Sequence, residues 1–488
     1  AHVQADRLRA DGASMITARV EGDLTLSGVP AKPVEKLRRA LSFANPEVIN
    51  LKRFGRYWGT TNESLPERIE CMIEHPDGSV SVPRGSIETV RETLAREGCR
   101  IEAVEDRRTR GSQLGLARAD APSLRYYQRE ALDAFEKKTQ GVIVLPCGGG
   151  KTRLGVAAIH RLNVDTLIIA HTSDLLDQWE REVQSLGIVP GVVDGDRGRN
   201  EGGRAVVIAS VFTLARMLTE ESPTPTIAGR WFERFGLVIL DEAHHAPAVT
   251  FQGVLAKVPA KFRLFLTATP EREDGLTPIM HWMAGPVVYA KDTIELMAEG
   301  FLMRPDVVIV ESAFAFTYDG PTKRAGDALN EALEKDEARN ALIVGIANLD
   351  AAEGETVLVL SDRRSHCRLL GRMLKSAGVA HHVVLGTTAK KTRKGAIEEL
   401  RAGEVPVLVA TSLADEGLDV RRLSRVILAW PARAKGRTQQ RLGRLMRHWP
   451  AKEPKLYDIV DNGVDTLKRR ASERRKVYVE LGLIRGRR

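Results

Sequence analysis

Short apolar runs alternate with helical stretches over most of the 488-residue chain. From Leu124 onward the runs are rich in β-branched residues, and they comprise Gly141–Leu145, Thr166–Ala170, Ala205–Ala209, Leu237–Leu240 and Arg263–Leu266. The rhythm resumes at Thr356–Leu360, Val383–Leu385, Val407–Ala410 and Arg425–Ala429. Strands that alternate with helices predict βαβ units and parallel sheets. We therefore expect an α/β fold with two parallel-sheet lobes that divide near residue 305.

The N-terminal part of the chain follows a different pattern, which predicts a small α+β unit over residues 15–118. Apolar positions at helical spacing in Pro33–Phe43 and Ser86–Arg96 indicate two helices. His75-Pro76-Asp77-Gly78 is a hairpin turn sequence between two strand-like segments. The expected strands are Ile16–Val20, Leu24–Leu26, Ile69–Glu74, Ser79–Pro83 and Arg100–Val104.

Basic residues concentrate at the C-terminal end. The formal net charge is +9, and residues 468–488 contain nine Lys or Arg and two Glu, a local charge of +7. A basic tail on a nearly neutral body is typical of contact with a polyanion, although such a tail can also be only solvated. The expected organisation is a disordered leader or tag at 1–14, an N-terminal accessory domain at 15–118, a first lobe at 119–305, a second lobe at 306–467 and a basic tail at 468–488.

Composition excludes several classes of protein. The chain is 43% hydrophobic and 28% charged, as in ordinary globular proteins. No apolar run approaches the roughly 18 residues that a membrane helix needs, and the first residues are too polar for a secretory signal. The four cysteines are not spaced as metal-ligand pairs. We therefore expect no membrane partner and a cytoplasmic location.

A candidate phosphate-binding loop lies between the strand-like Gly141–Leu145 and a helical stretch. Its sequence is Pro146-Cys147-Gly148-Gly149-Gly150-Lys151-Thr152. Glycines allow backbone N–H groups to surround phosphates, and the following helix adds the positive end of its dipole. Lys151 is expected to reach the β- and γ-phosphates and Thr152 to hold Mg²⁺. Leu145 replaces the usual first glycine, so this motif alone also fits a glycine-rich turn.

Two carboxylates follow a buried strand about ninety residues later. Leu237–Leu240 runs directly into Asp241 and Glu242. Asp241 suits a metal held through water, and Glu242 suits a general base that orients and deprotonates an attacking water. A helix cap is the alternative interpretation of such a pair.

Three arginines recur at every third position in Gln440–Arg447. Arg441, Arg444 and Arg447 should therefore lie near one face of a helix. Such a basic face is usually only solvated. With a nucleotide site on the other lobe, it is interpreted as a source of arginine fingers, which stabilise charge on a transferring phosphoryl group.

In order and spacing, these motifs resemble those of superfamily 2 helicases over roughly residues 120–465, and most closely the XPB-type branch. The matching segments are Leu124–Gln128, Leu145–Thr152, His171–Trp179, Asp241–His244, Thr267–Pro270, Arg272–Asp274, Thr411–Asp419 and Gln440–Arg447. The resemblance implies two RecA-like lobes with ATP and Mg²⁺ between them. The compact plan is also similar to that of UvsW-type phage helicases.

The resemblance also implies roles for individual residues. Gln128 would read adenine with Arg125 nearby, Asp419 would approach the ribose, and Gln440 would position the lytic water. Arg444 and Arg447 would act as the fingers. The implied nucleic-acid contacts are Thr172, Ser210, Arg272, Glu273, Asp274 and Thr411.

Two regions depart from the XPB-type pattern. The stretch Glu311–Asp336 is short for the thumb-like insertion of that branch, and the N-terminal unit matches no damage-recognition domain. Residues 52–59 interleave basic and aromatic side chains, including Arg53 and Trp58. Such a patch fits nucleic-acid binding as well as it fits ordinary core packing.

The sequence thus predicts an ATP-dependent DNA helicase or translocase with 3′→5′ polarity. Its expected partner is single-stranded, forked or branched DNA, with RNA not excluded. Two alternatives remain open at this point. One is the motor subunit of a nuclease or restriction assembly with a separate nuclease partner. The other is a nucleic-acid-binding scaffold without catalysis.

Overall fold

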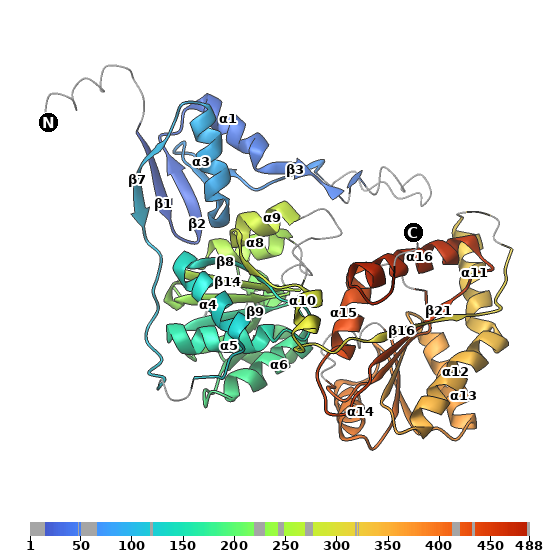
Figure 1. Cartoon of the computed structure of the whole chain (residues 1–488). Coiled ribbons are helices and arrows are strands. Elements are labelled where there is room, and N and C mark those ends of the chain that lie inside the picture. The colour runs from blue at the N-terminus through green and yellow to red at the C-terminus, as the bar shows by residue number, and fades with distance from the viewer. Residues whose placement is uncertain are drawn as a thin grey trace, which may run out of the picture. The chain divides into compact units, whose positions relative to one another are not determined.

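The computed structural model describes residues 15–46, 48–49, 66–117, 121–218, 230–242, 248–268, 277–317, 320, 322–411, 420–431 and 435–485. The chain divides into two compact units (Figure 1). The first combines Ala1–Leu145 with Lys151–Ala290, and the second combines Pro146–Gly150 with Lys291–Arg488. The division falls at Ala290, at the edge of the margin of 15 residues around the expected break near residue 305.

The N-terminal domain is a five-stranded sheet in the order β5-β6-β2-β1-β7, with α1 and α3 on one face (Figure 1). Leu24 and Leu26 of the sheet pack with Leu37 of α1 and Leu94 of α3. The elements are β1 (Ile16–Val20), β2 (Asp23–Ser27), α1 (Ala31–Ala40), β3 (Ser42–Ala44), β4 (Arg68–Glu70), β5 (Ile73–Glu74), β6 (Val80–Pro83), η2 (Arg84–Ser86), α3 (Ile87–Arg96) and β7 (Ile101–Asp106). The predicted α+β character is confirmed.

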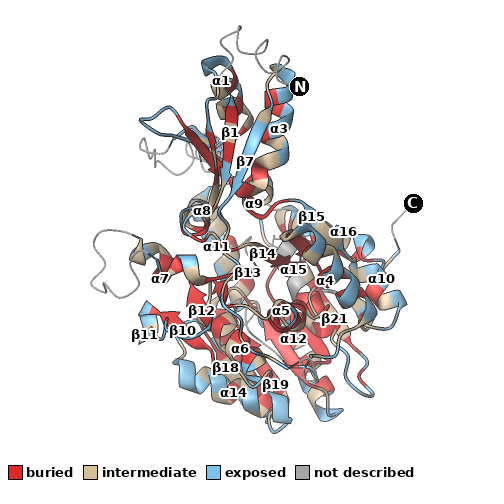
Figure 2. Cartoon of the chain, turned by 90° about the vertical axis from the view of Figure 1, so that its left-hand side faces the viewer, coloured by how far each residue is buried: buried red, intermediate tan, exposed pale blue. Residues whose placement is uncertain are grey.

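The first lobe is an eight-stranded sheet in the order β11-β10-β12-β9-β13-β14-β8-β15, parallel except for β11. Every residue of β9, β12 and β13 is buried, as expected where helices cover both faces of a sheet (Figure 2). The elements are α4 (Tyr126–Lys138), β8 (Gln140–Val144), α5 (Lys151–Leu162), β9 (Thr166–Ala170), α6 (Ser173–Gln184), β10 (Gly191–Asp194), η4 (Gly195–Arg197), β11 (Arg199–Asn200), β12 (Val206–Ser210), α7 (Val211–Met217), η6 (Phe232–Arg234), β13 (Leu237–Asp241), α8 (Ala248–Ala256), β14 (Phe262–Thr267), α9 (Thr277–Ala284) and β15 (Val287–Ala290).

The second lobe is a six-stranded, wholly parallel sheet in the order β16-β21-β20-β17-β19-β18. Its elements are α10 (Thr293–Ala298), β16 (Asp306–Glu311), α11 (Lys323–Lys335), α12 (Glu337–Ala352), β17 (Val357–Leu360), α13 (Arg364–Ser376), β18 (His381–Val384), α14 (Lys390–Ala402), β19 (Val407–Ala410), β20 (Arg425–Leu428), α15 (Lys435–Leu445), β21 (Lys455–Val460) and α16 (Asp465–Glu480). The predicted α/β class with two parallel-sheet lobes is confirmed.

The basic C-terminal stretch belongs to the second lobe, which differs from the separate tail expected from residue 468. Residues 468–480 lie within α16, and Arg474 of this helix is buried. Its guanidinium pairs with the carboxylate of Asp458 on β21 at 2.7 Å, and Tyr478 donates to the same carboxylate. The remaining basic side chains include Lys468, Arg469 and Lys476, which are exposed.

Two buried arginines join the N-terminal domain to the first lobe. Arg84 of η2 donates to the carbonyl of Ala260 at 2.8 Å, and Arg263 of β14 donates to the carbonyl of Gly22 at 2.5 Å. A Cβ at Gly22 would lie 1.9 Å from the carbonyl oxygen of Ala256, so only glycine allows this approach. Because these contacts are buried, we expect the two domains to move together.

Replacing Arg263 by Met should therefore weaken the first unit. Arg263 also donates to the carbonyls of Leu255 and Val258, so the change leaves three buried acceptors without this donor. The free energy of unfolding should fall by about 3 kcal/mol or more in a denaturant titration. Arg216→Met is the control, since Arg216 is largely exposed and pairs with Asp196 at the surface. Equal effects of the two changes would contradict this account.

Candidate active site

The candidate phosphate loop connects β8 to α5, in the context that the sequence predicts. Gly148 and Gly150 have φ angles of +84° and +82°, a conformation that side chains disfavour. Lys151 is the first residue of α5 and is buried. Its Nζ donates to the carbonyl of Leu145 at 3.4 Å. The loop therefore has the backbone that a phosphate cradle needs, with an ammonium group at the start of the helix.

Glu242 places its carboxylate against Lys151. Asp241 ends β13, and only β14 separates β13 from β8 in the sheet, so both residues lie at the same edge as the loop. Glu242 has a φ of +49°, an uncommon conformation for a residue other than glycine. Its Oε1 lies 2.9 Å from Lys151 Nζ, and both side chains are largely buried. The ammonium group is thus neutralised by the residue expected to act as the general base.

Asp241 is an acid whose pKa is strongly raised at this site. It is 2% exposed, and its Oδ2 accepts a hydrogen bond from Trp179 Nε1 at 2.9 Å. Burial, followed by the neighbouring Glu242 carboxylate, raises the pKa of Asp241 to about 7, whereas Lys151 acts in the opposite direction. Its Oδ1 is buried and has no hydrogen-bond partner among the residues that the structure describes. A cation bound at this oxygen would favour the charged form.

These residues fit Mg²⁺ held together with a nucleotide. Within the described part of the chain, no group of three or more His, Cys, Asp or Glu could hold a metal ion. Mg²⁺ is commonly bound through one or two protein oxygens, with phosphates and water as the other ligands. Asp241 and the hydroxyl of Thr152 are the candidate protein ligands. Thr152 Oγ1 accepts a hydrogen bond from Gln178 Nε2 at 2.8 Å.

Two residues of this site, Gln178 and Trp179, have no role that the sequence alone indicates. Both lie on α6, which follows β9. The resemblance places them only in a motif that it associates with nucleic acid. Their contacts with Thr152 and Asp241 span 26 and 62 residues of sequence, so no local pattern could reveal them.

The residues expected at the adenine lie at the start of α4. The Oε1 of Gln128 accepts from the backbone N–H of Arg125 at 2.9 Å, which caps the helix. The guanidinium of Arg125 donates to the hydroxyl of Tyr127 at 2.9 Å. Gln128 is buried, so its oxygen is fixed by this cap. The expected contact with adenine stays a prediction.

Two of the expected nucleic-acid contacts lie near each other on the first lobe. Thr172 follows β9 and caps α6, where its Oγ1 accepts from Leu175 N at 3.4 Å. Ser210 ends β12, which pairs with β9 so that Ser210 lies opposite Ala170. Thr411 follows β19 in the second lobe, and its buried Oγ1 has no hydrogen-bond partner among the described residues.

The arginines of the second lobe occupy different environments. Arg441 on α15 is buried and pairs with Asp362 at 3.2 Å. Arg444 lies on the same helix and is partly exposed. The helix ends at Leu445, so Arg447 lies just beyond it. Arg441 is thus buried, whereas Arg444 and Arg447 are partly exposed.

Several predicted residues lie outside the described part of the chain. These are Arg272, Glu273, Asp274 and Asp419, the side chain of Gln440, the leader at 1–14, and the basic and aromatic patch at 52–59. Their expected roles stay predictions.

Comparison with known proteins finds two matches to protein families. The family profile described as "Type III restriction enzyme, res subunit" matches residues 121–272. The profile described as "Helicase conserved C-terminal domain" matches residues 337–448. In the part of the chain that the structure describes, no helix is both long and apolar enough to cross a membrane.

Several of the similar proteins are named XPB. The "DNA 3'-5' translocase XPB2" of Sulfurisphaera tokodaii is 29% identical over 62% of this chain and 73% of its own length. The "DNA 3'-5' helicase XPB" of Mycobacterium tuberculosis is 28% identical over 61% of this chain, but over only 53% of its own length. The structure of S. cerevisiae Dbp5 bound to RNA and ADP BeF3 aligns over 76% of this chain and 93% of its own, with a TM-score of 0.55 and 16% identity. T4 UvsW aligns over 95% of this chain and 97% of its own, with 16% identity and a TM-score of only 0.40.

The Lys151–Glu242 pair leads to opposite expectations for two variants. A triphosphate that binds at this loop would replace Glu242 as the partner of Lys151. Glu242→Gln removes the competing carboxylate, so the Kd for ATP without Mg²⁺ should stay the same or fall. Lys151→Met removes a charge-assisted hydrogen bond, so the Kd should rise by about tenfold or more. Calorimetric titration measures the Kd of each variant for ATP. Weaker ATP binding by Glu242→Gln would show that Glu242 does not compete with a phosphate for Lys151.

Proposed function

We propose that this chain, a superfamily 2 helicase related to the XPB type, uses ATP hydrolysis to move along DNA with 3′→5′ polarity. The observation that carries the proposal is the cluster of Lys151, Asp241 and Glu242 at one edge of the first-lobe sheet. A second parallel sheet with its own helicase profile accompanies it. The names of the XPB-type relatives support both the DNA substrate and the polarity.

Binding of the triphosphate is assigned to the loop and Lys151. Backbone N–H groups of Gly148–Gly150 surround the phosphates, and Lys151 exchanges Glu242 for a phosphate oxygen. Asp241 and Thr152 hold Mg²⁺, which neutralises charge on the phosphates when it is bound. Gln128 and Arg125 are proposed to recognise the adenine, and Asp419 to approach the ribose.

Hydrolysis is assigned to groups from both lobes. Once Lys151 has left it, Glu242 is available to orient a water and accept its proton. Gln440 is proposed to position the same water. Arg444 and Arg447 stabilise the negative charge on the transferring phosphoryl group. Arg441 is not assigned this role, because its guanidinium is already buried against Asp362.

Movement requires nucleic-acid contacts on both lobes that follow the state of the nucleotide. Thr172 and Ser210 are proposed contacts of the first lobe, together with Arg272, Glu273 and Asp274. Thr411 is the proposed contact of the second lobe. Contacts of this kind reach the backbone, so the activity should depend little on sequence. Single-stranded, forked or branched DNA is the proposed substrate.

A restriction-type or repair nuclease assembly is the second candidate, favoured by the match to the res subunit profile over residues 121–272. In that case the chain supplies the motor and another chain cuts. Co-purification of a nuclease with the native protein, followed by DNA cleavage that requires ATP, would support it. Strand separation by the chain alone, on forks without cleavage, would favour the first candidate.

The arginine-finger assignment predicts a loss of turnover without a loss of DNA binding. Arg444→Ala or Arg447→Ala should lower the kcat for ATP hydrolysis by about 10³-fold or more if that residue is a finger. The Kd for single-stranded DNA without ATP should change little. Arg372→Ala is the control, because Arg372 is exposed on α13 and has no assigned role at the nucleotide or at DNA. If DNA binding falls while turnover of the bound complex is normal, α15 contacts DNA instead.

The exposed basic side chains of α16 give a separate expectation. Deleting the stretch from residue 468 would remove the buried Arg474, so charge replacement is the better experiment. Lys468→Gln, Arg469→Gln and Lys476→Gln, combined, should flatten the dependence of log K on log salt by roughly 0.9 for each phosphate of duplex DNA that the helix no longer neutralises. Fluorescence anisotropy at several salt concentrations measures this slope. An unchanged slope would mean that this helix face is only solvated.

A further inference from the structure

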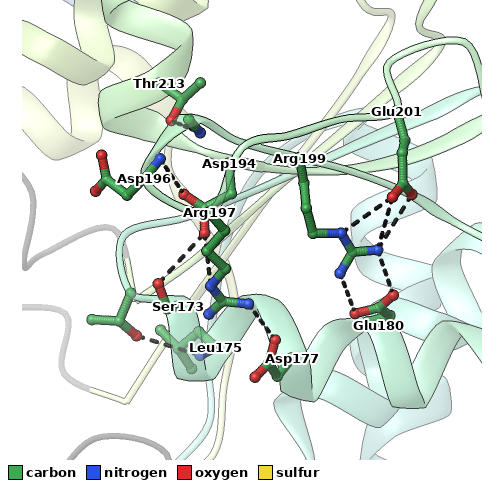
Figure 3. Close-up of polar contacts among 12 residues, drawn as sticks. Ser173, Leu175, Asp177, Glu180, Asp194, Asp196, Arg197, Arg199, Glu201 and Thr213 are labelled. Carbon is green, nitrogen blue, oxygen red and sulfur yellow. Dashed lines mark hydrogen bonds and ion pairs between the residues drawn. The ribbon is translucent and has the colours of Figure 1, made fainter. Parts of the chain in front are cut away.

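Four consecutive residues of helix α6 make polar contacts with residues outside the helix. Gln178 and Trp179 contact Thr152 and Asp241, at 2.8 and 2.9 Å. Their neighbours Asp177 and Glu180 form ion pairs with the segment that follows β10 (Figure 3). One stretch of α6 thus contacts both candidate Mg²⁺ ligands, and its flanking residues tie it to the edge of the sheet.

The ion pairs of Asp177 and Glu180 hold α6 on the side of the sheet edge. Arg197 pairs with Asp177 at 2.5 Å and with Asp194, the last residue of β10, at 3.0 Å. Arg199 on β11 forms a bidentate pair with Glu180, at 2.9 and 3.0 Å (Figure 3). Bidentate pairs fix geometry better than single contacts do. The side chains of these two ion pairs are only partly exposed, so the pairs are more constrained than ion pairs at the open surface.

The contact of Trp179 with Asp241 is more constrained than these ion pairs. Trp179 is fully buried, and a Cβ at Gly155 of α5 would lie 2.3 Å from its ring. The ring therefore has little freedom to rotate, and the direction of its N–H is fixed. Because this N–H occupies Oδ2 of Asp241, the free oxygen of that carboxylate is Oδ1, which is buried and has no partner among the described residues.

The contact of Gln178 with Thr152 is also compatible with metal binding. A hydroxyl group has two lone pairs and one hydrogen. The amide N–H of Gln178 occupies one lone pair of Thr152 Oγ1. The second lone pair remains for a cation, and the hydroxyl hydrogen remains for an acceptor. The contact therefore orients Thr152 without blocking metal binding.

We infer that Gln178 and Trp179 are positioning residues for Mg²⁺, which orient Thr152 and Asp241 before the metal arrives. This inference rests on the proposed function, since it concerns the same nucleotide site. The competing interpretation is that Trp179 only fills the core and Gln178 only satisfies a hydroxyl. Loss of such outer partners of a metal site typically weakens metal binding by roughly 10–100-fold, whereas a packing role would change stability alone.

The decisive variant is Trp179→Phe, which keeps an aromatic ring and removes the N–H. Its control is Trp231→Phe, because Trp231 lies in the same unit and donates its Nε1–H to the carbonyl of Gly202 at 2.8 Å, with no role at the site. Mn²⁺ serves as the probe and is titrated by electron paramagnetic resonance against the full chain in the presence of ADP. The Kd for Mn²⁺ should rise by about tenfold or more in Trp179→Phe and stay unchanged in Trp231→Phe.

A second measurement separates affinity from chemistry. The Mg²⁺ concentration that gives half-maximal ATPase activity should rise in Trp179→Phe by a similar factor, while kcat at saturating Mg²⁺ largely recovers. Gln178→Met provides a second variant if Trp179→Phe folds poorly, and it should shift the Kd for Mn²⁺ in the same direction. Unchanged metal affinity in folded Trp179→Phe, or in Gln178→Met, would overturn the assignment of that residue.

Failure of this inference is distinguishable from failure of the proposed function. If the unmodified chain binds neither ATP nor Mn²⁺ with ADP, the proposed function itself is wrong. If the unmodified chain hydrolyses ATP and both α6 variants bind Mn²⁺ normally, only the positioning role is wrong.

Discussion

Two buried carboxylates facing one buried ammonium group are the constraint on which the site depends. Asp241 and Glu242 follow β13, and Lys151 follows the loop after β8. Parallel strands bring these groups to one edge of the sheet, where the N-terminus of α5 also points. Burial, followed by the neighbouring Glu242 carboxylate, raises the pKa of Asp241, and Glu242 neutralises Lys151. A bound cation and a triphosphate would relieve both effects together, which is why the proposed function assigns the two ligands to one site.

The first unit carries more than the candidate nucleotide site. The buried contacts of Arg84 and Arg263 make the N-terminal domain and the first lobe one compact unit. Any nucleic-acid surface on the N-terminal domain would then move with Thr172 and Ser210. The accessory domain is thus better regarded as an extension of the first lobe than as a freely attached module.

The sequence predicted well what depends on local pattern. The central strands and the loop from Pro146 to Lys151 are in place, because buried parallel strands and glycine-rich turns have strong local sequence patterns. Short edge strands such as β10 and β11 were missed, because their few residues carry little periodicity. The interpretation of α16 as a separate tail was wrong. The sequence was misleading because basic residues outnumber the apolar positions in this stretch, and because one of these basic residues, Arg474, is itself buried. Long-range contacts such as that of Trp179 with Asp241 leave no trace in the periodicity of the sequence.

The central claim is that one site hydrolyses ATP and that nucleic acid controls its rate. Steady-state ATP hydrolysis by the full chain, measured with Mg²⁺ in the presence and absence of single-stranded DNA, tests this claim most directly. The account predicts slow ATP hydrolysis without DNA and a clear rise in kcat with DNA. It also predicts that Glu242→Gln loses hydrolysis under both conditions. Hydrolysis that is indifferent to nucleic acid, or that persists in Glu242→Gln, would contradict it.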